Sequence, residues 1–370
     1  MKVLVLNGGS SSLKCWYHDL AGDQATQAPK PLWQLHLDLK PGTRIEEALG
    51  PALRSIPGAV DVVGHRIVHG GKFRESVMLT SEVRAAIAQQ AEMAPTHNRL
   101  ELAAIDTVDR ILGTHVPQVV VFDTAFHATL PPAAYIYAGP YAWLDQGIRR
   151  YGFHGISHQY AAARAAELLG SKSPRLITCH LGNGASLAAV REGRSIDTTM
   201  GFTPLEGLMM GSRSGSLDPA ILIHLMRQGK TADQLDDLLN RQSGLFGISG
   251  ISGDMREILA AAESGNARAR LAFEIYAHRL LREMGGMLAV LGGLDALVFT
   301  GGVGENCPPL RAAAVRQFAF MGLRLDPAKN AGPDPDMDVA AADSAVRVLV
   351  IHAEEEWEIA RECYRVVGFS

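Results

Sequence analysis

The sequence predicts an α/β protein with mixed sheets, and three observations lead to that prediction. Short apolar runs that suit β-strands alternate along the chain with longer segments of helical periodicity. Two of these runs turn through glycine-rich loops into a second strand, so we expect antiparallel pairs beside parallel ones. Glycine accounts for 38 of the 370 residues. That is about a tenth of the chain against a usual ~7%, which is typical of turns that approach a ligand.

The chain opens with a predicted hairpin. Lys2–Leu6 is a β-rich apolar run, the turn Asn7–Ser12 reads NGGSSS, and Leu13–His18 alternates in character. Backbone N–H groups and small hydroxyl side chains at such a turn form a concavity that suits an anion. The sequence therefore predicts a phosphate-binding turn here, although these residues taken alone also fit an ordinary hairpin.

The same design returns in the second half of the chain. Residues 176–180 form a strand-like run, the turn Leu181–Gly184 follows, and residues 185–190 and 195–199 continue as strands. The repetition predicts two copies of one structural unit, with two phosphate-side turns that would bracket a nucleotide. A third glycine turn is expected at residues 301–305, after an apolar strand at 296–300.

The remaining elements follow from hydrophobic periodicity. The helices are expected at residues 81–93, 100–112, 160–169, 218–227, 267–291 and 354–367, and further strands at 117–126 and 346–351. Strands that alternate with helices favour α/β architecture.

Composition excludes several classes of function. Lys and Arg total 35 against 39 Asp and Glu, so the formal net charge of −4 lacks the basic character of a nucleic-acid-binding protein. Four cysteines, far apart and without a CxxC pair, suggest neither a zinc cage nor a disulfide framework, and they fit a reducing compartment. No apolar run is long enough to span a bilayer, and the N-terminus does not resemble a signal peptide. We therefore expect a cytoplasmic protein that binds neither nucleic acid nor membranes.

Five clusters rich in His, Arg, Asp and Gly carry candidate chemistry. They lie at residues 64–71 (GHRIVHGG), 94–99 (APTHNR), 121–127 (VFDTAFH), 149–158 (RRYGFHGISH) and 201–219 (GFTPLEGLMMGSRSGSLDP). Together with the two hairpins, these motifs and their order closely resemble the acetate kinase family of short-chain carboxylate kinases, over almost the whole chain. The resemblance implies the duplicated two-domain fold of the actin/hexokinase/sugar-kinase type.

The resemblance also implies a domain organisation. Residues 1–150 would form an N-terminal domain with the phosphate and metal loop and the carboxylate side, and helix 355–370 would return to it. Residues 151–354 would form a C-terminal domain for nucleotide binding. The family forms homodimers through this second domain, so a homodimer is expected.

Matching the family's motifs position by position assigns catalytic and substrate roles. The catalytic residues would be Asp123, His154, Arg213 and Arg66. The substrate-binding residues would be Arg66, Val68, Phe153 and Pro204, the last three as an apolar pocket for a methyl group. A planar guanidinium suits both a carboxylate and a transferring phosphoryl group. Taken singly, the arginines also fit salt bridges, and the other residues also fit core packing.

The same matching assigns the nucleotide, phosphate and metal sites. The nucleotide-binding residues would be Lys14, His180, Leu181, Gly182, Asn183, Gly184, Asp254, Met255, Arg256, Gly302, Val303, Gly304, Glu305 and Asn306. Ser10 and Ser12 would supply phosphate-loop hydroxyls, and Asn7 and Glu355 would lie at the metal. The implied reaction is reversible phosphoryl transfer from ATP to acetate, which gives acetyl phosphate and ADP. The implied cofactor is Mg²⁺, with Mn²⁺ as an alternative.

Physical chemistry argues against one role that the family gives to Asp123, that of proton acceptor. A small carboxylic acid has a pKa near 4.3, so it is already an anion at neutral pH and needs no base to become a nucleophile. We therefore expect Asp123 to orient an arginine or a Mg²⁺-bound water molecule, with a turn or N-cap role as the structural alternative.

The chain departs from the family pattern at two places. Thr96 replaces an aliphatic residue, which leaves the choice between acetate and propionate open, since one methylene is worth only about 1–3 kcal/mol in an apolar pocket. Before the last helix the chain reads His352-Ala353-Glu354-Glu355-Glu356 where the family typically has Thr-Asn-Glu-Glu. Glu355 aligns with the metal-linked glutamate, with Glu354 and Glu356 as competitors.

Three alternatives remain open at this point. A related kinase for propionate or butyrate would share the chemistry. A non-catalytic actin-like nucleotide-binding protein would need neither the arginines nor His154 and Asp123. A sugar kinase would need a general base and a polar pocket.

Overall fold

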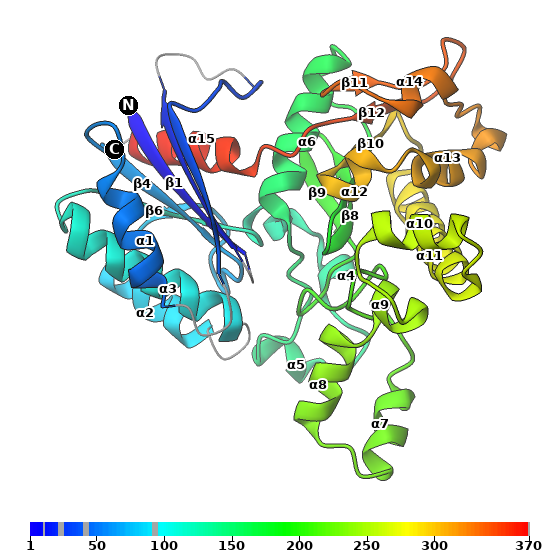
Figure 1. Cartoon of the computed structure of the whole chain (residues 1–370), viewed down its shortest axis with the longest axis horizontal. Helices are drawn as coiled ribbons and strands as arrows, with labels where there is room; N and C mark the ends of the chain where they lie inside the picture. The colour runs from blue at the N-terminus through cyan, green and yellow to red at the C-terminus, as the bar shows by residue number, and fades with distance from the viewer. Residues whose placement is uncertain (10–11, 21–25, 40–43, 91–94, 369–370) are drawn as a thin grey trace. The chain divides into compact units, whose positions relative to one another are not determined.

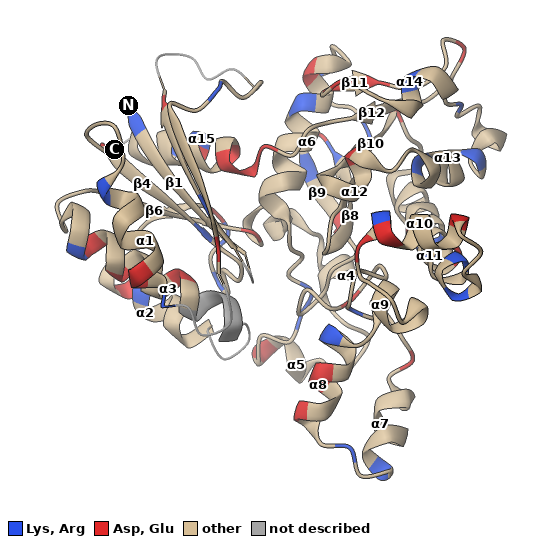
Figure 2. Ribbon diagram, in the orientation of Figure 1, with Lys and Arg blue, Asp and Glu red and all other residues tan. Residues whose placement is uncertain are grey.

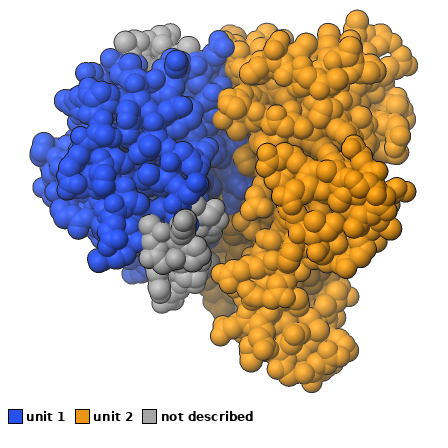
Figure 3. Space-filling model, in the orientation of Figure 1, with its two compact units in different colours: residues 1–128, 153–160, 354–370 blue, residues 129–152, 161–353 orange. Residues whose placement is uncertain are grey.

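The computed structural model describes residues 1–9, 12–20, 26–39, 44–90 and 95–368, without the side chains of residues 95–99. The chain forms two units (Figure 3). Unit 1 comprises Met1–Ala128, Phe153–Tyr160 and Glu354–Ser370, and unit 2 comprises Thr129–Gly152 and Ala161–Ala353. Each unit is built on its own six-stranded sheet.

The sheet of unit 1 has the strand order β3-β2-β1-β4-β6-β5. Its strands are β1 (Lys2–Gly8), β2 (Ser12–Asp19), β3 (Trp33–Asp38), β4 (Val62–Ile67), β5 (Val77–Met78) and β6 (Gln118–Phe122). The predicted N-terminal hairpin is present, since β1 and β2 pair antiparallel with Asn7 opposite Lys14. Strands β1, β4 and β6 run parallel, and β5 pairs antiparallel with β6, so the sheet is mixed.

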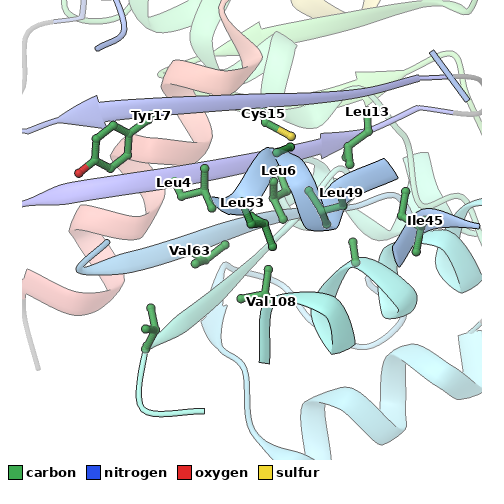
Figure 4. Packing of buried hydrophobic residues seen from close by; sticks show 13 residues of the cluster. Leu4, Leu6, Leu13, Cys15, Tyr17, Ile45, Leu49, Leu53, Val63 and Val108 are labelled. Atoms are coloured by element: carbon green, nitrogen blue, oxygen red, sulfur yellow. The ribbon is translucent and has the colours of Figure 1, made fainter. Parts of the chain in front are cut away.

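Helices cover both faces of this sheet. They are α1 (Ile45–Arg54), α2 (Ser81–Gln90), α3 (Pro95–Leu112) and α15 (Glu355–Gly368), with a 3-10 turn, η1, at Ala125–Thr129. On one face, Leu4, Leu6 and Val63 pack with Leu49 of α1 and Val108 of α3 in a fully buried cluster (Figure 4). Side chains alternate along a strand, so the residue after Val63 faces the other way, where α15 lies.

Gly64 sets how closely α15 approaches β4. A Cβ atom at this position would lie 2.5 Å from Cys363 Sγ and 2.8 Å from Ile359 Cγ2. The absence of a side chain on Gly64 therefore allows the last helix of the chain to pack directly on the central strands.

Replacing Gly64 should loosen this packing. We expect Gly64→Ala to lower the free energy of unfolding by roughly 1–3 kcal/mol, the usual effect of overpacking a core, in urea titrations followed by circular dichroism. The matched control is Gly285→Ala inside a long helix of unit 2, where an added Cβ meets nothing within 4 Å and a gain of about 0.5–1 kcal/mol is expected. Equal stabilities for Gly64→Ala and the wild type would contradict this account.

The sheet of unit 2 repeats the arrangement of unit 1. Its order is β11-β12-β10-β7-β8-β9, and its strands are β7 (Leu176–Leu181), β8 (Ala185–Arg191), β9 (Arg194–Thr198), β10 (Ala296–Thr300), β11 (Met337–Asp338) and β12 (Arg347–Val350). Strands β7 and β8 form the second predicted antiparallel hairpin, β10 runs parallel to β7 and β12, and β11 is an antiparallel edge. Read from hairpin to edge, both sheets have the same topology, so the mixed α/β architecture and the duplication are confirmed.

Some helices of unit 2 lie beside this sheet, and others extend away from it (Figure 1). They are α4 (Pro132–Tyr135), α5 (Ala142–Asp145), α7 (Ala220–Arg227), α8 (Ala232–Arg241), α9 (Gly244–Ser249), α10 (Met255–Glu263), α11 (Ala267–Leu291), α12 (Gly301–Asn306), α13 (Pro308–Arg316) and α14 (Pro327–Ala331), with a 3-10 turn, η2, at Ala319–Met321. Helix α6 (Gly155–Leu168) begins in unit 1 and ends in unit 2. Within the described residues, no helix has the length and apolarity that a membrane span requires.

Two expectations differ from the structure in detail. Residues 301–305 form helix α12 rather than a turn, because the Glu305 carboxylate accepts a hydrogen bond from Gly301 N–H and closes the first helical turn. The units also divide the chain elsewhere than between residues 150 and 151. Arg150 donates to three backbone carbonyls at residues 198–200 of unit 2, whereas Gly155 N–H donates to the Asp123 carbonyl of unit 1.

Candidate active site

The first turn of α15 brings carboxylates to the β1–β2 hairpin. Asn7 Nδ2 donates to Glu355 Oε2 at 3.2 Å and to Glu356 Oε1 at 3.0 Å, and Lys14 Nζ lies 2.9 Å from Glu356 Oε1. The acidic start of α15 is visible in red in Figure 2. Burial acts to lower the pKa of Lys14, but Glu356 outweighs it, so the pKa is raised and Lys14 stays charged. Glu356, itself buried, is thus neutralised by Lys14, whereas Glu355 is only half-buried.

Arg66 is held in place by Asp123 and Asn7. Arg66 Nε and Nη2 donate to the two oxygens of Asp123 at 3.1 and 2.6 Å, and Nη1 donates to Asn7 Oδ1 at 3.1 Å and to the Gly8 carbonyl at 3.2 Å. Burial acts to lower the pKa of Arg66, but Asp123 and Glu355 outweigh it, and the net shift is upward. The two oxygens of Asp123 therefore fix the plane of a charged guanidinium, which is the geometry of an orienting carboxylate.

His154 occupies a strained turn beside Asp123. Its φ is +56°, in the left-handed region that few non-glycine residues adopt and that costs about 1–3 kcal/mol. The neighbouring Gly155 N–H donates to the Asp123 carbonyl at 2.8 Å, and a Cβ at Gly155 would lie only 2.1 Å from that oxygen. This hydrogen bond attaches the turn to the end of β6. His154, which lies on this turn, is half-buried.

The residues assigned to the apolar pocket fall in both units. Val68 (4% exposed) and Phe153 (1% exposed) belong to unit 1, and the ring of Phe153 contacts His69 edge-on at 5.7 Å. Pro204 belongs to unit 2, where its carbonyl accepts a hydrogen bond from Arg213.

Sequence reasoning missed Glu101, a residue of α3 that supports this region. Val68 N–H donates to Glu101 Oε1 at 3.1 Å, and no donor among the described residues reaches the buried Oε2 atom. Burial raises the pKa of the Glu101 carboxyl to about 8, although Arg66 acts to lower it. The available signal was an acidic residue within the apolar stripe of an amphipathic helix, between Leu100 and Ala104.

Glu101 should make stability depend on pH. A carboxyl whose pKa is raised on folding binds its proton more tightly in the folded state, so this group lowers the free energy of unfolding as pH rises from about 4.3 toward 8. Glu101→Gln keeps an oxygen for Val68 and removes the titration. In urea titrations at each pH, we compare the free energy of unfolding of Glu101→Gln with that of the wild type. We expect the difference in favour of Glu101→Gln to increase by roughly 2–3 kcal/mol between pH 5 and pH 7.5.

Glu263→Gln is the control for this experiment, since it makes the same chemical change at an exposed carboxylate. A difference between Glu101→Gln and the wild type that does not change with pH would show that Glu101 ionises as freely in the folded protein as in the unfolded chain.

Unit 2 contains a cavity of about 710 Å³ onto which three of the predicted nucleotide motifs converge. The β7–β8 turn contributes Gly182 and Asn183, and helix α12 contributes Gly302, Val303 and Asn306. The third motif, at the start of α10, contributes Asp254, Met255 and Arg256. Asp254 is the N-cap of α10, and its hydrogen bonds from Arg256 hold its pKa below the usual range.

The other residues assigned to the nucleotide do not line this cavity. These residues are Lys14, which belongs to unit 1, and His180, Leu181, Gly184, Gly304 and Glu305. Leu181 and Gly304 are buried. Glu305 turns inward, where Oε1 accepts hydrogen bonds from Gly301 N–H at 2.9 Å and Ala353 N–H at 3.0 Å. Its side chain therefore shapes the backbone around the cavity.

Arg311 is a second residue that sequence reasoning missed. It is fully buried, and its guanidinium donates to the carbonyls of Gly304 and Glu305, each at 2.7 Å, and to Asn330 Oδ1 at 2.8 Å. These carbonyls lie in the last turn of α12, so Arg311 satisfies acceptors that a helix end leaves without partners. The sequence offers no signal for this role, because the partners are mostly backbone atoms.

Arg213 differs from Arg66 in its surroundings. Its Nη1 donates to the Pro204 carbonyl at 2.9 Å, and among the residues that the structure describes no carboxylate pairs with it. Burial lowers its pKa. An unpaired, partly desolvated guanidinium is a strong site for an anion.

Some sequence predictions fall outside the described residues. These predictions concern Ser10 and the side chain of Thr96. Ser12 begins β2, and its carbonyl accepts a hydrogen bond from Gly9 N–H at 2.8 Å across the turn.

The side-chain oxygen atoms of Asn7 and Glu355 are suitable ligands for a hard divalent cation. Carboxylate and amide oxygens are the ligands that Mg²⁺ prefers, and Asn7 Oδ1 keeps one lone pair after accepting from Arg66. In the described part of the chain, no group of three or more His, Cys, Asp or Glu side chains is arranged to hold a metal. This set fits an ion that takes most of its ligands from water and substrate phosphates.

The two units share one sheet topology, and in each unit a hairpin turn lies beside charged or glycine-rich elements. These features define the duplicated actin/hexokinase/sugar-kinase-like class of proteins. A family model described as the acetokinase family matches residues 47–361. The acetate kinase of Gloeobacter violaceus is 56% identical, with 99% of each chain covered. The chain belongs to the acetokinase family.

Two solved structures show the same relationship. The crystal structure of Porphyromonas gingivalis acetate kinase has a TM-score of 0.87 at 38% identity and covers 99% of both chains. A propionate kinase from Francisella tularensis has a TM-score of 0.88 at 34% identity and covers 99% of this chain and 100% of its own.

Proposed function

We propose that this protein is an acetate kinase that transfers the γ-phosphoryl group of ATP to acetate, reversibly, and forms acetyl phosphate and ADP. The observation that carries the proposal is the Arg66–Asp123 pair. Its guanidinium is charged, fixed in orientation and partly accessible at the end of β4, which suits a small carboxylate. Relatives that bear the name acetate kinase at 50–56% identity over nearly the full chain support this choice of reaction.

The proposed chemistry needs no general base. One oxygen of the acetate anion attacks the γ-phosphorus, the bond from that phosphorus to the β–γ bridging oxygen breaks, and ADP leaves with that electron pair. No proton is transferred. Both oxygens of Asp123 are hydrogen-bonded to Arg66, so Asp123 acts by holding the guanidinium rather than by accepting a proton.

Catalysis then consists of positioning and charge stabilisation. In unit 1, Arg66 would bind the carboxylate, Lys14 the nucleotide phosphates and His154 the phosphoryl group in transfer. In unit 2, the 710 Å³ cavity is large enough for a nucleoside and is lined by backbone-rich turns and by Asp254 at a helix start. Arg213 would stabilise negative charge that develops on the γ-phosphoryl oxygens.

We propose Mg²⁺ as the metal, with Asn7 and Glu355 as its protein contacts. Glu355 is favoured over Glu356 because Lys14 already neutralises Glu356. When bound, the ion would neutralise charge on the β- and γ-phosphates.

Specific observations bear on two alternative functions. A propionate or butyrate kinase would use the same residues, and the solved propionate kinase matches the fold as well as the acetate kinase does. The curated relatives and the buried Val68 and Phe153 favour the smaller acid. A sugar kinase is disfavoured, because Asp123 is not arranged to activate a neutral hydroxyl.

We also propose that two copies associate through unit 2 in the cytoplasm. Helix α7 presents Ile221, Ile223 and Met226, each about half exposed, and none of its residues is buried within the chain. A helix with such a side-chain set is typical of a protein–protein interface.

The first experiment is a substrate panel. Acyl phosphate trapped with hydroxylamine is measured with formate, acetate, propionate and butyrate at saturating MgATP. We expect acetate to give the highest kcat/KM, by at least tenfold over butyrate, because each added methylene must fit beside Val68 and Phe153. A preference for propionate or butyrate would change the assigned substrate but leave the proposed mechanism unchanged. No acyl phosphate with any acid would overturn the proposal.

Arg213→Ala tests the role of the Arg213 guanidinium, which has no carboxylate partner among the described residues. We expect kcat to fall by 10²–10³ while the Kd for ADP, from isothermal titration calorimetry, changes less than threefold, since the interaction is made mainly in the transition state. The control is Arg241→Ala, which replaces an exposed arginine on α8 whose Nη1 pairs with Asp237. A normal kcat for Arg213→Ala would remove this residue from the mechanism.

A further inference from the structure

Glu305 joins two segments of unit 2 that are distant in sequence. Its Oε1 accepts hydrogen bonds from Gly301 N–H, at the start of α12, and from Ala353 N–H, at the end of unit 2. Its Oε2 accepts from the ring of His352, with Nδ1 at 2.6 Å. The Glu305 side chain is only 15% exposed, so these donors replace most of the water that a carboxylate would otherwise bind.

His352 is in turn held by its own backbone. Its N–H donates to Asp336 Oδ1 at 3.2 Å, which holds the backbone of the residue whose ring contacts Glu305. Burial acts to raise the pKa of Glu305, but the hydrogen bond and the charge of His352 outweigh it, and the pKa is lowered. His352 thus favours the charged form of a carboxylate that accepts two backbone N–H groups.

The start of α12 packs closely against the end of β7, so there is little room for α12 to move. Gly301 has a φ of +78°, and a Cβ there would lie 2.9 Å from the carbonyl oxygen of Leu181, at the end of β7. In the same helix, Gly302, Val303 and Asn306 line the cavity of unit 2. A shift of the Glu305 carboxylate would therefore move a wall of that cavity.

We propose that His352 is a positioning residue for nucleotide binding. By orienting Glu305, it fixes the start of α12 and with it the shape of the 710 Å³ cavity. The inference rests on the proposed function in so far as that cavity is taken to bind ATP and ADP.

The test compares two substitutions at His352 in the full-length protein. His352→Ala removes the donor, whereas His352→Asn places an amide Nδ2 close to the position of Nδ1. The readouts are the Kd for ADP by calorimetry, which needs no turnover, and the separate KM values for MgATP and acetate. We expect His352→Ala to raise the Kd for ADP and the KM for MgATP five- to tenfold and to leave the KM for acetate within twofold. His352→Asn should restore both nucleotide values to within twofold of the wild type.

His36→Ala is the matched control. His36 is as exposed as His352 and also pairs with a carboxylate, Asp38, but it lies on edge strand β3 of unit 1. Its loss should leave every constant unchanged.

The inference is overturned if His352→Ala binds ADP as tightly as the wild type, if Ala and Asn are equally impaired, or if the KM for acetate rises as much as that for MgATP. A wild-type chain that binds ADP but forms no acyl phosphate would contradict only the proposed function. A wild-type chain that binds no nucleotide would contradict both proposals.

Discussion

The buried contact between Arg66 and Asp123 is the interaction on which the first unit's chemistry depends. A guanidinium at the end of β4 is costly to bury unless its donors are satisfied, and Asp123, Asn7 and the Gly8 carbonyl satisfy four of its hydrogen bonds. Asn7 and Gly8 lie at the end of β1, and Asp123 directly follows β6. The sheet order, with β4 between β1 and β6, is what brings them together.

The C-terminal helix completes this cluster, and its packing depends on a missing side chain. Because Gly64 lacks a Cβ, α15 approaches β4 closely enough for its acidic first turn to meet Asn7 and Lys14. The positive charges of Arg66 and Lys14 are thus balanced within the protein before any substrate binds. An anionic substrate or a metal ion can then enter a site whose side chains are already oriented, which lowers the reorganisation cost of catalysis.

Unit 2 has the same topology as unit 1 but is held in place by different contacts. Where unit 1 fixes side chains by ion pairs, unit 2 fixes backbone, through Glu305 at the start of α12 and Arg311 at its end. A cavity walled by glycine-rich backbone can lie close against a flat ligand without steric conflict. The two units therefore share one scaffold, and the side chains next to each turn determine which groups that turn offers to a ligand.

Local pattern alone determined much of the fold. Helix α11 and strand β10 have the expected bounds, 267–291 and 296–300, and both hairpins lie where the glycine turns predicted them, because periodicity and turn chemistry are local properties. The motif order pointed to the acetokinase family, and the assigned nucleotide residues include most of those that line the cavity of unit 2. Local pattern failed at residues 301–305, where the hydrogen bond from Gly301 to Glu305 turns an expected loop into a helix.

Only the tertiary structure decided which charges meet. Nothing in the order of residues shows that Glu356 pairs with Lys14, that Glu101 supports Val68, or that His352 binds Glu305. These pairs join segments between 33 and 342 positions apart, and their distances follow from the packing of helices on sheets. The sequence determined the types of group available for the reaction, and the three-dimensional packing determined their partners, because the partners of a buried charge are set by proximity in space and not by separation along the chain.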